Sequence, residues 1–237
     1  MSNVKLAIRV RPFTDRELRA DKDRVQVVEV QDDRTVTITN VKVSASGAGD
    51  SRERVRTYRA DFAFDSSCPV TNIAYASQEK IFSTLGHEVL SSLSAGRSAC
   101  VLTYGQSATG KTHTMMGTDT QPGLAARLCT ALAELQTDIT VSFLEIYNER
   151  VHDLLACEAA SSCNSLPRRT GNARKDLRVR EHPTRGPYVQ NLRRVAVADS
   201  NTLVALVNQG AKLRRTAATK RNSSSSRSHA LLVLTTP

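Results

Sequence analysis

Residues 105–112 read GQSATGKT, which matches the pattern G-x-x-x-x-G-K-[ST]. The glycines permit a tight loop whose backbone N–H groups turn inward around phosphate groups, where a Cβ would not fit. In such a loop the lysine, here Lys111, reaches the β- and γ-phosphates of a nucleotide, and the hydroxyl of Thr112 binds Mg²⁺. Because such a loop lies between a strand and the start of a helix, this stretch constrains the fold of the chain more than any other.

The flanking residues fit that requirement. ACVLTY (99–104) is a short apolar run of the kind found in buried parallel strands, and a helix is expected to begin at Lys111. Apolar residues repeat every four positions over 77–95, which predicts another helix. Strands alternate with helices along the chain, so we expect an α/β fold with a central, mainly parallel or mixed sheet flanked by helices. The other expected elements are strands at 4–10, 25–30, 35–39, 139–147, 177–181 and 230–236, a loop at 44–57, and helices at 124–135 and from Asp199 or Ser200 to about Arg215.

Length and composition allow several classes of partner. The chain has 237 residues, enough for one large domain or two small ones. Lys and Arg number 33 against 23 Asp and Glu, a net charge of +10, which favours nucleic acid, an acidic membrane face or an acidic protein surface. A solvated basic surface without a partner explains the charge equally well.

The cysteines and the apolar residues point to the cell interior. The five cysteines are odd in number and show no C-x-x-C spacing, so neither a disulfide framework nor a zinc site is indicated. Reduced thiols in a cytosolic protein fit best. No apolar stretch approaches the ~20 residues of a membrane span, so we expect a soluble intracellular protein with no transmembrane segment.

Three further stretches accompany the loop in order: IRVRPF (8–13), SFLEIYNE (142–149) and NSSSSRSH (222–229). Together with TYGQSATGKTHTMMG (103–117), they resemble the motor domain of a kinesin. The resemblance covers essentially the whole chain. It implies a P-loop NTPase fold and an ATPase that uses ATP and Mg²⁺ to move along microtubules, in the cytoplasm and on the cytoskeleton.

Two other stretches resemble one kinesin class in particular. LRVREHPTRGPYVQNL (177–192) and GAKLRRTAAT (210–219) are similar to the third class, which carries vesicles and organelles. The tubulin surface is acidic, so the resemblance gives the net charge a partner and makes a nucleic-acid partner unnecessary. A nucleic-acid-dependent P-loop ATPase is a reading that rests on the charge alone.

The resemblance assigns roles to residues that match the family's motifs. Arg9, Arg11 and Pro12 fall in an R-x-R-P motif that contacts adenine, although the two arginines would also fit an exposed strand face. His113 follows the loop threonine, and its family counterpart stacks on adenine from the other side. The phosphates are expected to contact the loop residues Gly105, Gln106, Ser107, Ala108, Thr109, Gly110, Lys111 and Thr112.

The tract NSSSSRSH resembles the nucleotide-sensing loop called switch I, although a Ser-rich tract by itself is typical of a flexible linker. By the resemblance, Ser226 supplies a second hydroxyl to Mg²⁺, and Ser225 and Asn222 lie near the γ-phosphate and help to hold the attacking water. Arg227 normally pairs with a glutamate of the switch II motif. The expected catalytic residues are Lys111, Asn222, Ser225 and Arg227.

P-loop ATPases need a second acidic motif, which in kinesins is switch II, D-L-A-G-S-E or close to it. That sequence does not occur, so we interpret residues 1–237 as the N-terminal part of a kinesin motor domain, incomplete at the C-terminus, without switch II, the following helices, and the cargo and dimerisation regions. We expect little turnover from such a fragment; a genuinely shortened protein is the less favoured explanation. The alternative function is a degenerate, non-motor kinesin-like binding module. Glu145, Tyr147 and Asn148 of the FLEIYNE stretch are expected to be structural.

Overall fold

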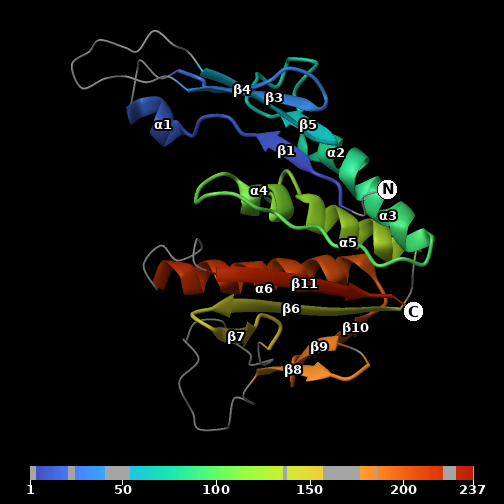
Figure 1. Ribbon diagram of the computed structural model, residues 1–237. Helices are drawn as coiled ribbons and strands as arrows, with labels where there is room; N and C mark the ends of the chain where they lie inside the picture. Colours follow the sequence, from blue (N-terminus) through green and yellow to red (C-terminus); the bar gives the residue numbers. More distant parts are fainter. Residues whose placement is uncertain are drawn as a thin grey trace. The chain divides into compact units, whose positions relative to one another are not determined.

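The structure, a computed structural model, describes residues 4–20, 25–40, 54–135, 138–156, 177–184, 186–220 and 228–236 (Figure 1). The chain divides into two compact units, Met1–Ser92 and Leu93–Pro237. Each unit combines helices with strands, as the α/β prediction requires. Within the described ranges, no helix is both long enough and apolar enough to cross a membrane.

The first unit contains two small sheets. β1 (Ala7–Val10) pairs in parallel with β5 (Phe62–Asp65). β2 (Val28–Val30), β3 (Thr35–Asn40) and β4 (Arg54–Arg59) form an antiparallel sheet in which β3 is central. The strand predicted at 35–39 is therefore confirmed, and those predicted at 4–10 and 25–30 are present but begin three residues later.

The helix predicted over 77–95 is present and packs against the first unit's core. The Oγ of Ser77 accepts a hydrogen bond from the backbone N–H of Lys80 (3.1 Å) and caps the start of the helix. Ile81, one turn further on, is buried in a cluster with Phe64. The helix consists of α2 (Gln78–Ile81), a π-helical turn η1 (Phe82–Gly86) and α3 (His87–Ser94).

The second unit is a sheet centred on one long strand, with two helices packed on each other and against the sheet. The central strand of this sheet is β6 (Ile139–Tyr147). It pairs antiparallel with β7 (Arg150–Asp153), β10 (Val195–Val197) and β11 (Ser228–Thr235). The helices of the unit are α4 (Lys111–Met116), α5 (Leu124–Leu135) and α6 (Ser200–Lys220), of which α5 and α6 contact each other and α6 contacts β6.

Apolar faces of α5, β6 and α6 form the core of the second unit. Asp199 Oδ1 accepts a hydrogen bond from the backbone N–H of Thr202 (2.8 Å), which confirms the predicted cap of α6. Gly210 lets α6 approach β6 closely, since a Cβ there would lie 2.5 Å from Cδ1 of Phe143. The most deeply buried apolar residues of this core are Leu124, Cys129, Ile139, Val141, Leu203 and Val207.

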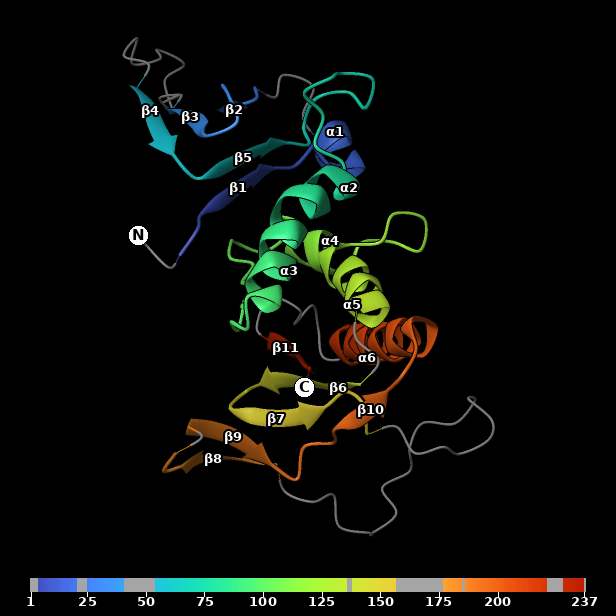
Figure 2. The same cartoon turned by 90° about the vertical axis from the view of Figure 1, so that its right-hand side faces the viewer.

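A separate antiparallel hairpin comprises β8 (Arg178–His182) and β9 (Gly186–Gln190) (Figure 2). All five residues of β8 are exposed to solvent. The strand predicted at 177–181 is thus present, and its partner β9 was not predicted because Gly186 and Pro187 read as a turn.

The prediction of a buried parallel strand at 99–104 is wrong. These residues form no strand, and the side chains of Leu102 and Tyr104 are 84% and 96% exposed. A strand needs a neighbour that takes up its backbone hydrogen bonds, and none of the described strands pairs with this segment. Among the described strands only β1 and β5 pair in parallel, so the sheet content is mixed.

The predicted loop at 44–57 is also wrong at its C-terminal end. Arg54 begins β4, which pairs with β3 over its full length. Small and charged residues suggested a loop, but backbone pairing with β3 outweighs that bias because β-propensity depends strongly on context.

Candidate functional site

The phosphate loop has the backbone that its glycines predict. Gly105 and Gly110 have φ angles of 153° and 93°, in the region that residues with a Cβ rarely adopt. A Cβ on Gly105 would also lie 2.7 Å from Oγ1 of Thr109, too close for a real side chain. Gly110 caps α4, and its carbonyl accepts a hydrogen bond from the N–H of Thr114 (2.9 Å), so the helix begins at Lys111 as predicted.

The loop is closed by its own side chains. Lys111 Nζ donates hydrogen bonds to the carbonyl oxygens of Gly105 (2.7 Å) and Gln106 (2.6 Å). Thr109 Oγ1 donates to the same carbonyl of Gln106 (2.9 Å). The ammonium group therefore lies against the inner turn of the loop, the position from which it can move to an incoming phosphate.

Ala108, at the tip of the loop, is strained. Its φ is 64°, in the left-handed region, although it carries a Cβ. The GQSATGKT motif gave no reason to expect this, because its pattern leaves position 108 open. Ala108 and its neighbours Ser107 and Thr109 are exposed, so no packing from the described residues encloses the tip.

Thr112 and His113 begin α4 directly after Lys111, and both side chains are exposed. The Thr112 hydroxyl is the kind of hard oxygen ligand that Mg²⁺ accepts. In the described part of the chain, no group of three or more His, Cys, Asp or Glu side chains is placed to hold a metal. Of the residues expected to bind the ion, Thr112 is therefore the one whose hydroxyl the structure describes, at the start of α4.

Arg9 is engaged inside the first unit. Its Nε donates to Ser66 Oγ (3.0 Å) and its Nη1 to Gln78 Oε1 (3.0 Å). Ser66 Oγ in turn donates to the carbonyl of Ala76 (2.6 Å). Burial lowers the pKa of the Arg9 guanidinium. Arg9 thereby joins β1 to the end of β5 and to α2.

Arg11 is held by a carboxylate that sequence reasoning missed. Glu17, in α1 (Asp15–Ala20), accepts hydrogen bonds from Nη1 and Nη2 of Arg11 at 2.8 and 2.7 Å. The N–H and Oγ1 of Thr14 also donate to Glu17, at 2.7 and 2.9 Å, and the backbone N–H of Glu17 donates back to Thr14 Oγ1 (3.3 Å), which completes a capping box. The hydrogen bond from Arg11 is the largest cause that lowers the pKa of Glu17 to about 2. The T-x-x-E spacing of Thr14 and Glu17 was the signal that could have found this pair.

The predicted site residues fall into three groups. Arg9, Arg11 and Pro12 lie in the first unit, and Gly105 through His113 lie in the second. The switch I residues Asn222, Ser225, Ser226 and Arg227 lie outside the described residues.

Ser228 is the first residue of the tract NSSSSRSH that the structure describes, and it is anchored to the second unit. Arg214 Nη2 donates to the carbonyl (3.3 Å) and Oγ (3.2 Å) of Ser228, at the start of β11. Arg214 also forms an ion pair with the buried carboxylate of Glu145 (3.4 Å). The burial of Glu145 fits its expected structural role. Arg214 was not singled out, although it lies in the stretch GAKLRRTAAT.

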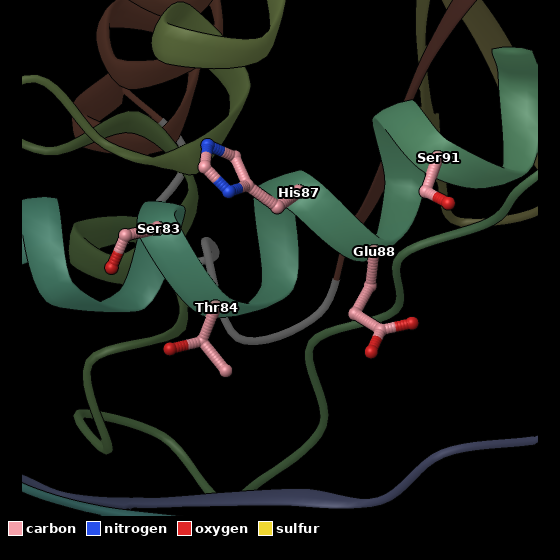
Figure 3. Close-up of a pocket in the computed structure, with 5 residues that line it drawn as sticks. All are labelled: Ser83, Thr84, His87, Glu88 and Ser91. Atoms are coloured by element: carbon pink, nitrogen blue, oxygen red, sulfur yellow. The ribbon is translucent and has the colours of Figure 1, made fainter.

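A surface hollow in the first unit lacks the arrangement of an active site. It is lined by Ser83, Thr84, His87, Glu88 and Ser91 (Figure 3). Ser83 and Thr84 donate their hydroxyls to the carbonyl of Lys80 in the same helix, and Glu88 pairs with Lys5. His87 and Glu88 point to different sides of the helix, so these groups do not converge on a common ligand.

Comparison with known sequences identifies the family. The profile of the kinesin motor domain matches residues 9–236. The kinesin-like protein KIF16B of Mus musculus is 41% identical over an alignment of 245 positions, and the match covers 99% of this chain and 18% of that protein. StAR-related lipid transfer protein 9 of Homo sapiens is 41% identical over an alignment of 246 positions, and the match covers 99% of this chain and 5% of that protein. The chain therefore spans less than a fifth of the length of these relatives.

Solved structures of kinesins share the fold. A fragment of KIF14, bound to AMP-PNP and in complex with a microtubule, has a TM-score of 0.77 and 34% identity; the match covers 98% of this chain and 60% of that chain. A fast kinesin has a TM-score of 0.74 and 27% identity, and the match covers 98% of this chain and 58% of that chain. The predicted P-loop NTPase fold is confirmed by these matches.

Proposed function

We propose that this chain, which belongs to the kinesin motor-domain family, binds ATP together with Mg²⁺ at residues 105–112 and contributes to a motor that couples ATP hydrolysis to movement along microtubules. The observation that carries the proposal is the geometry of the phosphate loop. Its two left-handed glycines shape the turn, and the Lys111 ammonium lies within it. The kinesin family consists of microtubule motors, so we propose that the energy of ATP hydrolysis is used for mechanical work.

Phosphate binding requires Lys111 to change partners. Its ammonium now donates to two neutral carbonyl oxygens of the loop. A phosphate oxygen is a stronger acceptor, because hydrogen bonds between charged groups are shorter and roughly twice as strong as neutral ones. The exchange favours the bound state, and Thr112 supplies a hydroxyl for Mg²⁺, which would neutralise further phosphate charge.

The remaining contacts are proposed from the resemblance. Arg9, Arg11, Pro12 and His113 are assigned to the adenine. Asn222, Ser225, Ser226 and Arg227 are assigned to the γ-phosphate side, with Ser226 as a second hydroxyl for Mg²⁺. Lys111 would stabilise the charge that develops on the transferred phosphoryl group.

The proposed macromolecular partner is the microtubule, and the proposed location is the cytoskeleton in the cytoplasm. The net charge of +10 complements the acidic tubulin surface. The exposed hairpin β8–β9 contributes Arg178 and Arg180 to this charge. The KIF14 fragments with similar structures are in complexes with microtubules.

Nucleotide binding is tested by calorimetric titration of the purified chain with Mg·ATP. Lys111→Ala should weaken binding by about 10- to 100-fold, since it removes a charge-assisted contact. Lys80→Ala, which removes an exposed lysine of the first unit, is the matched control and should bind like the wild type. Equal affinities of the wild type and Lys111→Ala would reject the proposed site.

Motor function is tested by co-sedimentation with microtubules in AMP-PNP and in ADP. A motor domain should bind with an affinity that depends on the nucleotide. Binding that ignores the nucleotide, or tighter binding to nucleic acid at physiological salt, would support the non-motor module or the nucleic-acid-dependent ATPase instead.

A further inference from the structure

We propose that Thr109 is a positioning residue of the phosphate loop, whose hydroxyl holds the loop open to phosphate while Lys111 changes partners. The inference rests on the proposed nucleotide site and assigns a role to a position that the motif leaves open. Thr109 acts on the loop backbone, through the carbonyl of Gln106, rather than on the ligand.

The carbonyl oxygen of Gln106 is the point at which the loop is tied together. It accepts hydrogen bonds from Thr109 Oγ1 (2.9 Å) and from Lys111 Nζ (2.6 Å). Lys111 Nζ also donates to the carbonyl of Gly105 (2.7 Å). These three hydrogen bonds connect the first half of the loop, residues 105–106, to the second half.

The two donors at Gln106 differ in what phosphate binding asks of them. Lys111 has three N–H groups, and two of them are occupied by loop carbonyls. When the ammonium turns to phosphate oxygens, one or both of these bonds are released. The hydroxyl of Thr109 has a single proton and remains on Gln106, so it becomes the side-chain tie that preserves the turn.

The packing of the loop supports this role. Oγ1 of Thr109 lies only 2.7 Å from the position that a Cβ on Gly105 would take. Because Gly105 has no side chain, the Thr109 hydroxyl has room to approach the backbone of residues 105–106. Ala108 lies inside the span that this hydrogen bond closes, and its left-handed φ of 64° favours relaxation of the turn. The Thr109–Gln106 hydrogen bond opposes that relaxation.

The test separates the hydroxyl from the shape of the side chain. Thr109→Val removes the hydroxyl and keeps the branched shape, whereas Thr109→Ser keeps the hydroxyl. Loss of one neutral hydrogen bond that preorganises the site should weaken binding by about 3- to 10-fold. The probes are Mg·ATP and magnesium tripolyphosphate, which has no base or ribose, in calorimetric titrations of the whole chain.

Thr130→Val is the matched control. Thr130 Oγ1 also donates to a backbone carbonyl of its own unit, that of Ala126 in α5 (3.2 Å), away from the loop. We expect Thr109→Val to lose affinity for both probes equally, and Thr109→Ser and Thr130→Val to bind like the wild type. Thr109→Ala, a second variant without the hydroxyl, should match Thr109→Val.

Three results would overturn the inference. The first is wild-type affinity in Thr109→Val and Thr109→Ala. The second is a loss in Thr109→Ser as large as that in Thr109→Val, because the hydroxyl would then be irrelevant. The third is a loss for Mg·ATP with unchanged tripolyphosphate binding, because the effect would then lie at the base or ribose. Failure of the wild type to bind either probe would instead reject the proposed nucleotide site, and the inference with it.

Discussion

Replacing Ala108 by glycine should stabilise the folded chain. The φ of Ala108, 64°, lies in the left-handed region, where a residue with a Cβ is disfavoured by about 1–2 kcal/mol. Glycine removes that penalty. The same substitution also lowers the free energy of unfolding by about 0.5–1 kcal/mol, because the unfolded chain gains conformational freedom when alanine becomes glycine. The difference predicts a net gain of about 0.5–1 kcal/mol in the free energy of unfolding.

Urea unfolding followed by far-ultraviolet circular dichroism measures this gain. With an unchanged slope of about 1–3 kcal/mol/M, the urea midpoint of Ala108→Gly should rise by about 0.2–1 M. Ala133→Gly is the matched control, because Ala133 lies in α5 and its φ is not positive. There the same replacement should lower the free energy of unfolding by about 1 kcal/mol.

Opposite shifts in the two variants would show that the backbone at position 108, rather than glycine in general, decides the sign. A midpoint for Ala108→Gly at or below that of the wild type, with the expected loss in Ala133→Gly, would refute the reasoning. In that case the left-handed conformation of Ala108 carries no net strain, and the Thr109–Gln106 hydrogen bond has no relaxation of the turn to oppose.

Two further substitutions test the first unit and the segment before the loop. The pKa of Glu17 falls from 4.5 to about 2 on folding, so its pairing with Arg11 stabilises the protein above pH 4.5 and is lost as the pH falls towards 2. Glu17→Gln should therefore be less stable than the wild type at neutral pH, and the two should converge as the pH approaches 2 in urea titrations; parallel pH profiles would contradict this. Leu102→Ser should change the free energy of unfolding by less than about 0.5 kcal/mol because the side chain is exposed. A loss of about 2–5 kcal/mol, as expected for a buried leucine, would instead support the buried strand that the apolar run suggested.

Local patterns account for the elements that the sequence predicted correctly. The helix over 77–95 and α5 have apolar stripes that repeat within a few residues, and their signals do not depend on distant partners. The caps at Ser77 and Asp199 are equally local, since each side chain binds a backbone N–H three residues later. The glycines of the phosphate loop are also a local signal, because a turn with positive φ angles favours glycine at those positions.

Features that depend on distant or backbone partners could not be predicted in this way. Residues 99–104 have the composition of a strand, but strand formation depends on a neighbour that composition does not name. Glu145 and Arg214 are 69 positions apart, and only the packing of α6 on β6 brings them together. The acceptor that joins Thr109 and Lys111 is a backbone carbonyl, a group that every residue carries.

Arg9 and Arg11 belong to the same motif but have different partners in the structure, which the motif alone does not reveal. They stand two positions apart, so an R-x-R-P motif treats them alike. In the structure Arg9 donates to Ser66 and Gln78 inside the first unit, whereas Arg11 is fixed by the carboxylate of Glu17 at the edge of α1. A guanidinium whose N–H groups are held in this way has a fixed plane, and its face is the part suited to stacking on a nucleobase. Arg9, the last but one residue of β1, is the more deeply buried of the two, whereas Arg11 follows the strand.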